Sequence, residues 1–194
     1  MASGVVTIPN LITFLRMALI PVFAILLFYG LFDLALLTFF FAGVSDGIDG
    51  FIARRFNQQS ELGTILDPIA DKLLMTTAFI IMTLPHIFPP TRHLPVPFWV
   101  TASVIGRDVL IVAAAAAIFI MTEFRGFKPS WLGKASTVVQ ISAVVVILAA
   151  AIFPSLQSFY LPTVYTVVAA FAFLSGVHYI FHVAKLINEE KNSA

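Results

Sequence analysis

Six apolar stretches, each about as long as a membrane-spanning helix, occupy most of this chain. A helix needs about 20 mostly apolar residues to cross the hydrocarbon core of a bilayer. The segments that meet this length are residues 9–30, 34–56, 61–84, 97–122, 132–153 and 161–185. The sequence therefore predicts an all-α integral membrane protein with six transmembrane helices.

The composition agrees with a membrane protein and excludes several other classes. Of the 194 residues, 60% are hydrophobic and 11% are charged, whereas soluble domains are usually about 25% charged. Cysteine is absent, which excludes disulfides and thiolate metal sites. No basic tract is present, so we expect no nucleic-acid partner. The first apolar stretch lacks a charged leading region and a cleavage site, so we expect a retained span within one membrane domain, residues 1–194.

Residues that break helices separate the apolar stretches. Gly30 closes the first stretch, and the polar residues 57–60 divide the second from the third. Five prolines lie between residues 85 and 97, before the fourth stretch, and Pro154 and Pro162 bracket the turn before the sixth. These breaks predict short connections between successive antiparallel helices.

The distribution of basic residues predicts the orientation in the membrane. Six spans place both termini on the same side. Seven basic residues fall at the even-numbered connections, at the span ends beside them or at the C-terminal end, namely Arg54, Arg55, Arg125, Lys128, Lys134, Lys185 and Lys191. The opposite side carries only Arg92. Because connections rich in Lys and Arg stay in the cytoplasm, we expect both termini and any active site at that end to be cytoplasmic.

Four aspartates lie in the second and third apolar stretches, where a carboxylate is costly. Asp46 and Asp49 are three residues apart, and Asp67 and Asp71 are four apart, so each pair shares one face of its helix. The connection between these helices is short. We therefore expect the two helices to form an antiparallel hairpin in which the four carboxylates converge at similar depth.

Convergent carboxylates repel one another unless cations neutralise them. Ligation by oxygen alone favours Mg²⁺ or Mn²⁺. Small residues would leave room for a substrate beside the acids: Gly43, Gly47, Gly50, Ala53 and Gly63. Some of the acids could instead cap helices, and Gly43 and Gly47 could serve helix packing. A cation transporter, with the acids as an ion relay, is the alternative functional class.

The spacing of these residues resembles a family signature. The pattern is Asp46-x-x-Asp49-Gly50-x-x-Ala53-Arg54, eight residues, then Gly63-x-x-x-Asp67-x-x-x-Asp71. It is similar at every fixed position to the motif of the CDP-alcohol phosphatidyltransferases. The segment TIPNLITFLR, residues 7–16, resembles the opening segment of that family, and the six-helix layout fits as well.

The resemblance implies an activity and roles for the acids. Members of the family cleave CDP-diacylglycerol or another CDP-alcohol, move the lipid phosphate to an acceptor hydroxyl and release CMP. On this chain the resemblance implies that Asp46, Asp49 and Asp67 bind metal, and that two ions are held. It implies that Asp71 lies near the second ion and acts as the general base. It also implies a homodimer.

The resemblance further implies a site for the nucleotide. Gly50, Ala53 and Gly63 would form its bed, and Arg54 would steady the diphosphate. Asn10 and Thr13, in the opening segment, would meet the nucleotide, or would instead cap the first helix at the membrane edge.

Charged residues in the fourth and fifth stretches are candidates for binding the acceptor. Arg107 lies mid-span beside Asp108, and Lys134 opens the fifth stretch. An arginine at this depth is expected to pair with an acid or a phosphate. Arg107 could therefore bind an acceptor or diphosphate phosphate with help from Lys134, pair with the metal-site acids, or pack against Asp108.

The stretch VIGRDVLIVAAAAAIF, residues 104–119, is similar to both phosphatidylglycerophosphate synthases and cardiolipin synthases that use CDP-diacylglycerol. Many of the former have Glu after this Arg and a second Arg about two turns later. Here Asp108 and the alanines 113–117 occupy those positions, which favours phosphatidylglycerol as acceptor. Phosphatidylglycerophosphate synthase is the commoner member of the family, so glycerol 3-phosphate is the first expected acceptor and phosphatidylglycerol is the alternative. Inositol phosphate, serine and choline are less favoured acceptors.

Overall fold

A computed structural model describes residues 8–55, 61–88, 94–121 and 131–193. Helices account for most of these residues, and no strand occurs among them. The elements are α1 Ile8–Phe28, α2 Phe32–Arg55, α3 Glu61–Thr83, α4 Phe98–Met121, α5 Trp131–Ile152, the 3₁₀ turn η1 Pro154–Leu156, and α6 Gln157–Ser193. The first five helices agree with the predicted ranges to within two residues.

The turn between α1 and α2 shows why the first break was predictable. Gly30 has φ of +70°, a left-handed conformation that glycine adopts without strain. The amide of Gly30 donates to the carbonyl of Leu27 at 3.0 Å, and the amide of Leu31 donates to Leu26 at 2.9 Å. This pair of hydrogen bonds is the Schellman motif, which satisfies the last carbonyls of a helix.

The sixth helix differs from its predicted range at both ends. Pro162 was expected to bound a turn, but it lies inside α6, which begins at Gln157. Because Pro162 is in the second helical turn, its missing N–H removes a single helical hydrogen bond and does not stop the helix. The helix also continues past residue 185 to Ser193, since no Gly or Pro interrupts it there.

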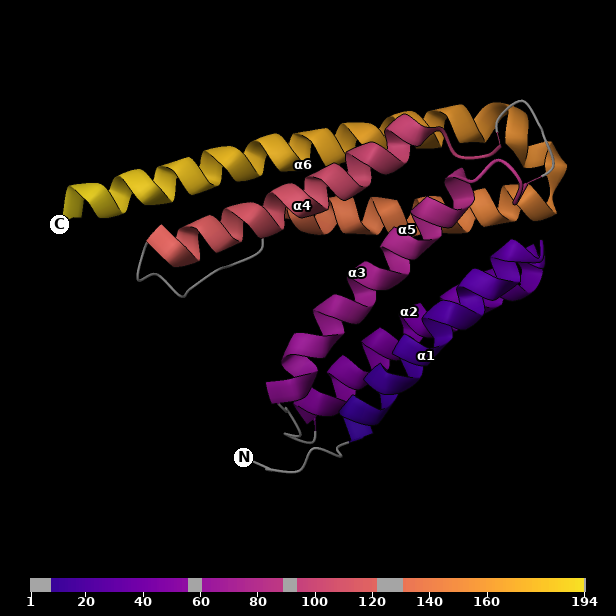
Figure 1. Cartoon of the computed structure of the whole chain (residues 1–194), viewed down its shortest axis with the longest axis horizontal. Helices are drawn as coiled ribbons and strands as arrows, with labels where there is room; N and C mark the ends of the chain where they lie inside the picture. The colour runs from indigo at the N-terminus through magenta and orange to yellow at the C-terminus, as the bar shows by residue number, and fades with distance from the viewer. Residues whose placement is uncertain (1–7, 56–60, 89–93, 122–130, 194) are drawn as a thin grey trace.

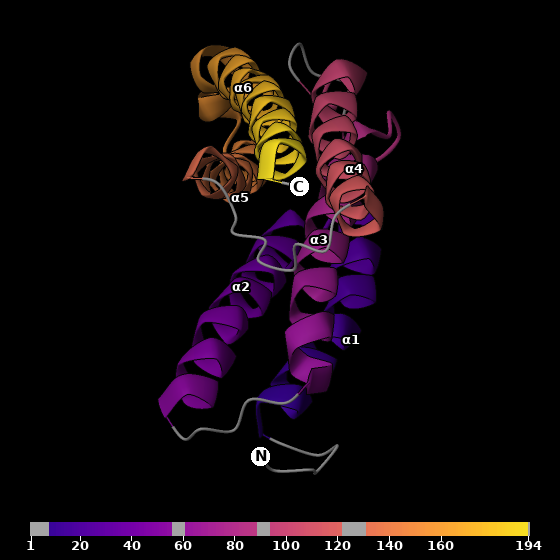
Figure 2. The same ribbon diagram turned by 90° about the vertical axis from the view of Figure 1, so that its left-hand side faces the viewer.

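The helices form two groups that meet in the middle of the molecule (Figures 1 and 2). In one group α1 packs along both α2 and α3, and in the other α6 packs along both α4 and α5. Contacts of α2 with α5, and of α3 with α4 and α5, join the groups. The second and third helices run antiparallel, as predicted (Figure 2). Among the described residues, however, α1 makes the main contacts with each of them, and α2 and α3 touch only slightly.

Apolar side chains fill the interior and also cover much of the outside. Phe23 packs on Phe39 between α1 and α2 with a ring-centroid distance of 5.7 Å, and Phe32 stacks on Phe88 at 4.9 Å. Many large apolar side chains are exposed on the helices, as expected where lipid is the solvent.

Length and composition alone identify three candidate membrane spans among the described residues, namely Asn10–Phe28, Trp131–Ile152 and Tyr160–Phe181. An apolar part of α2, Phe32–Ser45, is shorter. The six helices are therefore observed, whereas six membrane crossings stay a prediction.

Replacement of a core phenylalanine should destabilise the protein more than replacement of an outward-facing one. Phe79 is fully buried in α3, and Phe173 in α6 is 70% exposed. Lipid is as apolar as the core, so most of the cost of Phe79→Ala is the cavity, and we expect a loss of about 2 kcal/mol. Phe173→Ala is the control and should change stability little. Thermal unfolding in detergent measures both, and equal effects would contradict the assigned core.

Candidate functional site

The signature residues fall on α2 and α3, near the end of the molecule where α2 ends and α1 and α3 begin (Figure 1). Five of them lie on the last turns of α2: Asp46, Asp49, Gly50, Ala53 and Arg54. The side chains of these five lie outside the described part of the structure. Their predicted roles as metal ligands and nucleotide contacts therefore stay predictions.

The other signature residues lie on α3, and the structure describes them. Asp67 and Asp71 are both partly buried, and Gly63, one turn earlier, is buried. Pro68 is exposed between the two acids, and α3 continues through it from Glu61 to Thr83. The four-residue spacing therefore places both carboxylates on one side of an unbroken helix, as predicted.

A stripe of polar residues on α1 faces this part of the molecule. Asn10, Thr13 and Arg16 recur every three residues on an otherwise apolar helix, and each is at most 1% exposed. The hydroxyl of Thr13 donates to Oδ1 of Asp67 at 2.6 Å. The structure thus joins a residue of the opening segment to an acid of the signature. Because the hydroxyl uses one carboxylate oxygen, the second oxygen of Asp67 can ligate a cation.

Arg16 is the third residue of this stripe and was not among the predicted site residues. A fully buried arginine within an apolar helix is expected to have a functional or charge-balancing role. The signal for it was present in the sequence, because Arg16 continues the three-residue spacing of Asn10 and Thr13. Arg16 therefore belongs with them as a candidate site residue.

Of the four predicted metal ligands, the structure describes the side chains of Asp67 and Asp71. Among the described residues, no group of three or more His, Cys, Asp or Glu side chains could hold an ion. Asp67 and Asp71 are partly buried oxygen ligands on adjacent turns of α3, which suits a hard divalent cation. These two acids fit Mg²⁺ or Mn²⁺, and the predicted site needs Asp46 and Asp49 to complete it.

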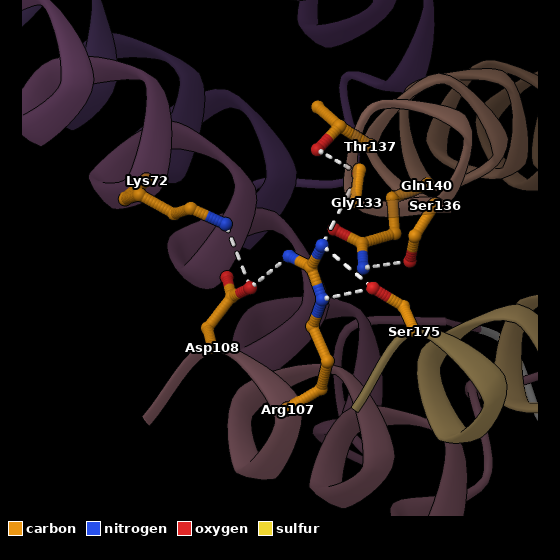
Figure 3. Close-up of polar contacts among 8 residues, drawn as sticks. All are labelled: Lys72, Arg107, Asp108, Gly133, Ser136, Thr137, Gln140 and Ser175. Atoms are coloured by element: carbon orange, nitrogen blue, oxygen red, sulfur yellow. Dashed lines mark hydrogen bonds and ion pairs between the residues drawn. The ribbon is translucent and has the colours of Figure 1, made fainter. Parts of the chain in front are cut away.

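Arg107 is buried where α4, α5 and α6 approach one another (Figure 3). Nη2 donates to the carbonyl of Gly133 at 3.1 Å and to Oγ of Ser175 at 3.1 Å, and Nε lies 3.3 Å from the same Oγ. Nη1 donates to Oδ1 of Asp108 at 2.6 Å. The structure thus shows the helix-packing role that the sequence left open. A role in binding the acceptor stays a prediction.

Two neighbouring cations differ in their surroundings. Lys134, beside Gly133 in the first turn of α5, is exposed. Lys72, directly after Asp71 on α3, forms an ion pair with Asp108 on α4, with Nζ 2.7 Å from Oδ1. Sequence spacing does not predict this pairing, because Lys72 and Asp108 lie on different helices.

Partly buried carboxylates and buried arginines thus lie within apolar helices. The chain belongs to the CDP-alcohol phosphatidyltransferase family, whose model matches residues 6–184. This membership and the apolar helices establish an integral membrane protein of a transferase family.

Two kinds of relative are found. Human cardiolipin synthase (CMP-forming) is 32% identical over 96% of this chain and 64% of its own length, and the rat protein is 34% identical over 93% and 63%. The CDP-diacylglycerol–glycerol-3-phosphate 3-phosphatidyltransferase of Pseudomonas fluorescens is 36% identical over 73% of this chain and 72% of its own. The chain thus spans somewhat less than two thirds of the human and rat proteins.

Removal of the Thr13 hydroxyl should weaken the contact between α1 and α3. Thr13→Val keeps the side-chain volume but removes the hydrogen bond that the Asp67 carboxylate accepts from this hydroxyl, so we expect a loss of about 1 to 3 kcal/mol. Thr13→Ser retains the hydroxyl and should stay close to the wild type. Thermal unfolding in detergent compares the two, and equal stability of both variants would show that the hydrogen bond contributes little.

Proposed function

We propose that this protein transfers the phosphatidyl group of CDP-diacylglycerol to a glycerol-based acceptor and releases CMP, with glycerol 3-phosphate as the first candidate acceptor. The observation that carries the proposal is the contact between Thr13 and Asp67 within a chain of this family. It brings the opening segment against an acid of the signature, so the two matching sequence regions form one site.

In the proposed reaction the acceptor hydroxyl attacks the phosphorus that carries the diacylglycerol. A new P–O bond forms to the acceptor, the P–O bond to CMP breaks, and the electron pair leaves with CMP. Asp71 accepts the hydroxyl proton as general base. Its position on α3, one turn beyond Asp67, suits this role because base and metal ligand must face the same phosphate.

The proposed metal ligands are Asp46, Asp49, Asp67 and Asp71, holding Mg²⁺ or Mn²⁺, with two ions expected. Bound divalent cations would neutralise charge on the diphosphate and on the departing CMP. The Thr13 hydroxyl holds one oxygen of Asp67 and so fixes the direction of its carboxylate.

The nucleotide is proposed to bind among α1, α2 and α3. The residues assigned to it are Asn10, Thr13, Gly50, Ala53, Arg54 and Gly63. The burial of Asn10, Thr13 and Gly63 in the described structure supports a site enclosed between helices. We add Arg16 to this group as a cation that offsets the charge of the acids or of the diphosphate.

Phosphatidylglycerol is the second candidate acceptor, which would make the chain a cardiolipin synthase. Two observations favour it. The named cardiolipin synthases align with 93–96% of this chain and the Pseudomonas fluorescens transferase with 73%. In addition, protein groups already engage all three nitrogens of Arg107, which reduces its capacity for a free phosphate. Lys134, which is exposed, is the other cation proposed for the acceptor.

The proposal includes six membrane crossings with both termini and the site on the cytoplasmic side, and a homodimer. The alternating direction of the six helices (Figure 1) and the basic residues at one set of their ends support this topology. The chain has no cysteine, so single cysteines introduced at the ends of helices would report sidedness without a background signal.

An assay of CMP release decides between the acceptors. Purified protein is supplied with CDP-diacylglycerol and Mg²⁺ or Mn²⁺, and receives glycerol 3-phosphate in one reaction and phosphatidylglycerol in another. We expect metal-dependent CMP release that requires one of the two, with glycerol 3-phosphate tested first. Release with phosphatidylglycerol alone would identify a cardiolipin synthase, and no release with either would contradict a glycerol-based acceptor.

Loss of the proposed base should abolish most turnover without unfolding the protein. Asp71→Asn keeps the size of the side chain but cannot accept the proton, so we expect the rate to fall by about 10²- to 10⁴-fold. Asp33→Asn, a change at the start of α2 and away from the signature, is the matched control and should retain activity. Wild-type activity of Asp71→Asn would exclude its role as the base.

The alternative, a cation transporter, makes different predictions. Vesicles containing the protein would show ion flux without any CDP-lipid, and Arg54→Ala would have little effect on that flux. The transferase proposal expects no such flux, and it expects Arg54→Ala to lose most CMP release because the diphosphate loses its cation.

A further inference from the structure

Two polar links connect α3 to α4 among the described residues. At one link the hydroxyls of Thr83 and Thr101 lie 2.6 Å apart, and Thr101 also donates to the carbonyl of Phe79 at 3.2 Å. At the other link Lys72 pairs with Asp108. The helices are antiparallel, so the links lie at different levels, and the Lys72 link is the one beside the signature acids.

One carboxylate oxygen of Asp108 forms ion pairs with two cations. Oδ1 lies 2.7 Å from Nζ of Lys72 and 2.6 Å from Nη1 of Arg107. The side chains of Asp108 and Arg107 are 13% and 5% exposed, so water screens this pair poorly. The Lys72 side chain is 43% exposed, so water partly screens its pair with Asp108. Hydrogen bonds between ionised groups at these distances are the strong kind.

The chain of contacts continues into the second helix group. The guanidinium of Arg107, which donates to Asp108, also donates to Gly133 on α5 and to Ser175 on α6 (Figure 3). A single carboxylate thus couples α3, which carries Asp67 and Asp71, to the three helices of the other group. Direct packing of α3 against α4 is otherwise light.

From this geometry we propose that Lys72 and Asp108 are positioning residues that set the acceptor side of the site relative to the CDP side. The inference rests on the proposed function. The residues proposed for the nucleotide and the metals all lie on α1, α2 and α3, whereas Arg107 and Lys134 lie on α4 and α5. The link from Lys72 through Asp108 to Arg107 therefore joins the parts that bind the two substrates.

The proposal predicts a selective kinetic effect. Lys72→Met should raise KM for the acceptor about tenfold, since even a small displacement of the acceptor side of the site would weaken productive binding of the acceptor. KM for CDP-diacylglycerol should stay unchanged. Lys72→Arg retains the cation and should restore the wild-type values. In an Asp108→Asn background Lys72→Met should add nothing, because the bridge is already broken.

Thr101→Val is the matched control because it breaks the other link between the same helices. It should lower thermal stability and leave both KM values unchanged. Equal KM values in Lys72→Met and the wild type, or an equal rise for both substrates, would overturn the proposal. So would the same acceptor effect in Thr101→Val, since it would indicate general loosening of the helices.

A second measurement does not depend on turnover. Spin labels on Leu73→Cys in α3 and Val112→Cys in α4 occupy exposed positions in a chain without other cysteines. Lys72→Met should broaden the distribution of distances between the labels, and Lys72→Arg should not. If the wild type released no CMP with either acceptor, the proposed function would fail. The distance distribution would still test the bridge, and an unchanged distribution in Lys72→Met would overturn it.

Discussion

The pairing of charged and polar groups inside apolar helices is the constraint on which this structure depends. Each such group is costly in hydrocarbon unless another group satisfies it. Asp67 on α3 accepts a hydrogen bond from Thr13 on α1, and Arg107 on α4 donates to groups from α4, α5 and α6. These partners come from different helices, so satisfying them fixes which helices lie together. Apolar packing alone would specify this poorly, because lipid competes equally well for apolar surfaces.

The proposed binding of the two substrates is divided between the two helix groups in keeping with this constraint. The first group carries the signature and the buried polar stripe of α1, and the second carries a buried cation and an exposed one, Arg107 and Lys134. A transfer between two substrates requires both groups at a fixed separation. The packing of α2 against α5 contributes to that separation, and because direct packing between α3 and α4 is light, polar contacts contribute to it there.

The sequence predicted the helices well but could not show which distant helices pack together. Apolar length and the glycine and proline breaks are local properties, so the first five helix ranges agree to within two residues. The misplaced start of α6 has a local cause, because Pro162 falls too early in the helix to stop it. By contrast, the central position of α1 between α2 and α3 follows from contacts across the chain. Thr13 and Asp67 are 54 residues apart, and no spacing rule predicts that they meet.

At position 108, the residue type and the helix geometry act together. Spacing correctly placed Arg107 and Asp108 within a helix but could not choose among the possible partners of Arg107. Adjacent residues on a helix point about 100° apart, so Asp108 can face α3 while Arg107 faces α5 and α6. The carboxylate then lies between Lys72 and the guanidinium and accepts from both. A glutamate here would carry its carboxylate one methylene further from α4. The choice of Asp108 therefore bears on the spacing of α3 and α4 as well as on charge.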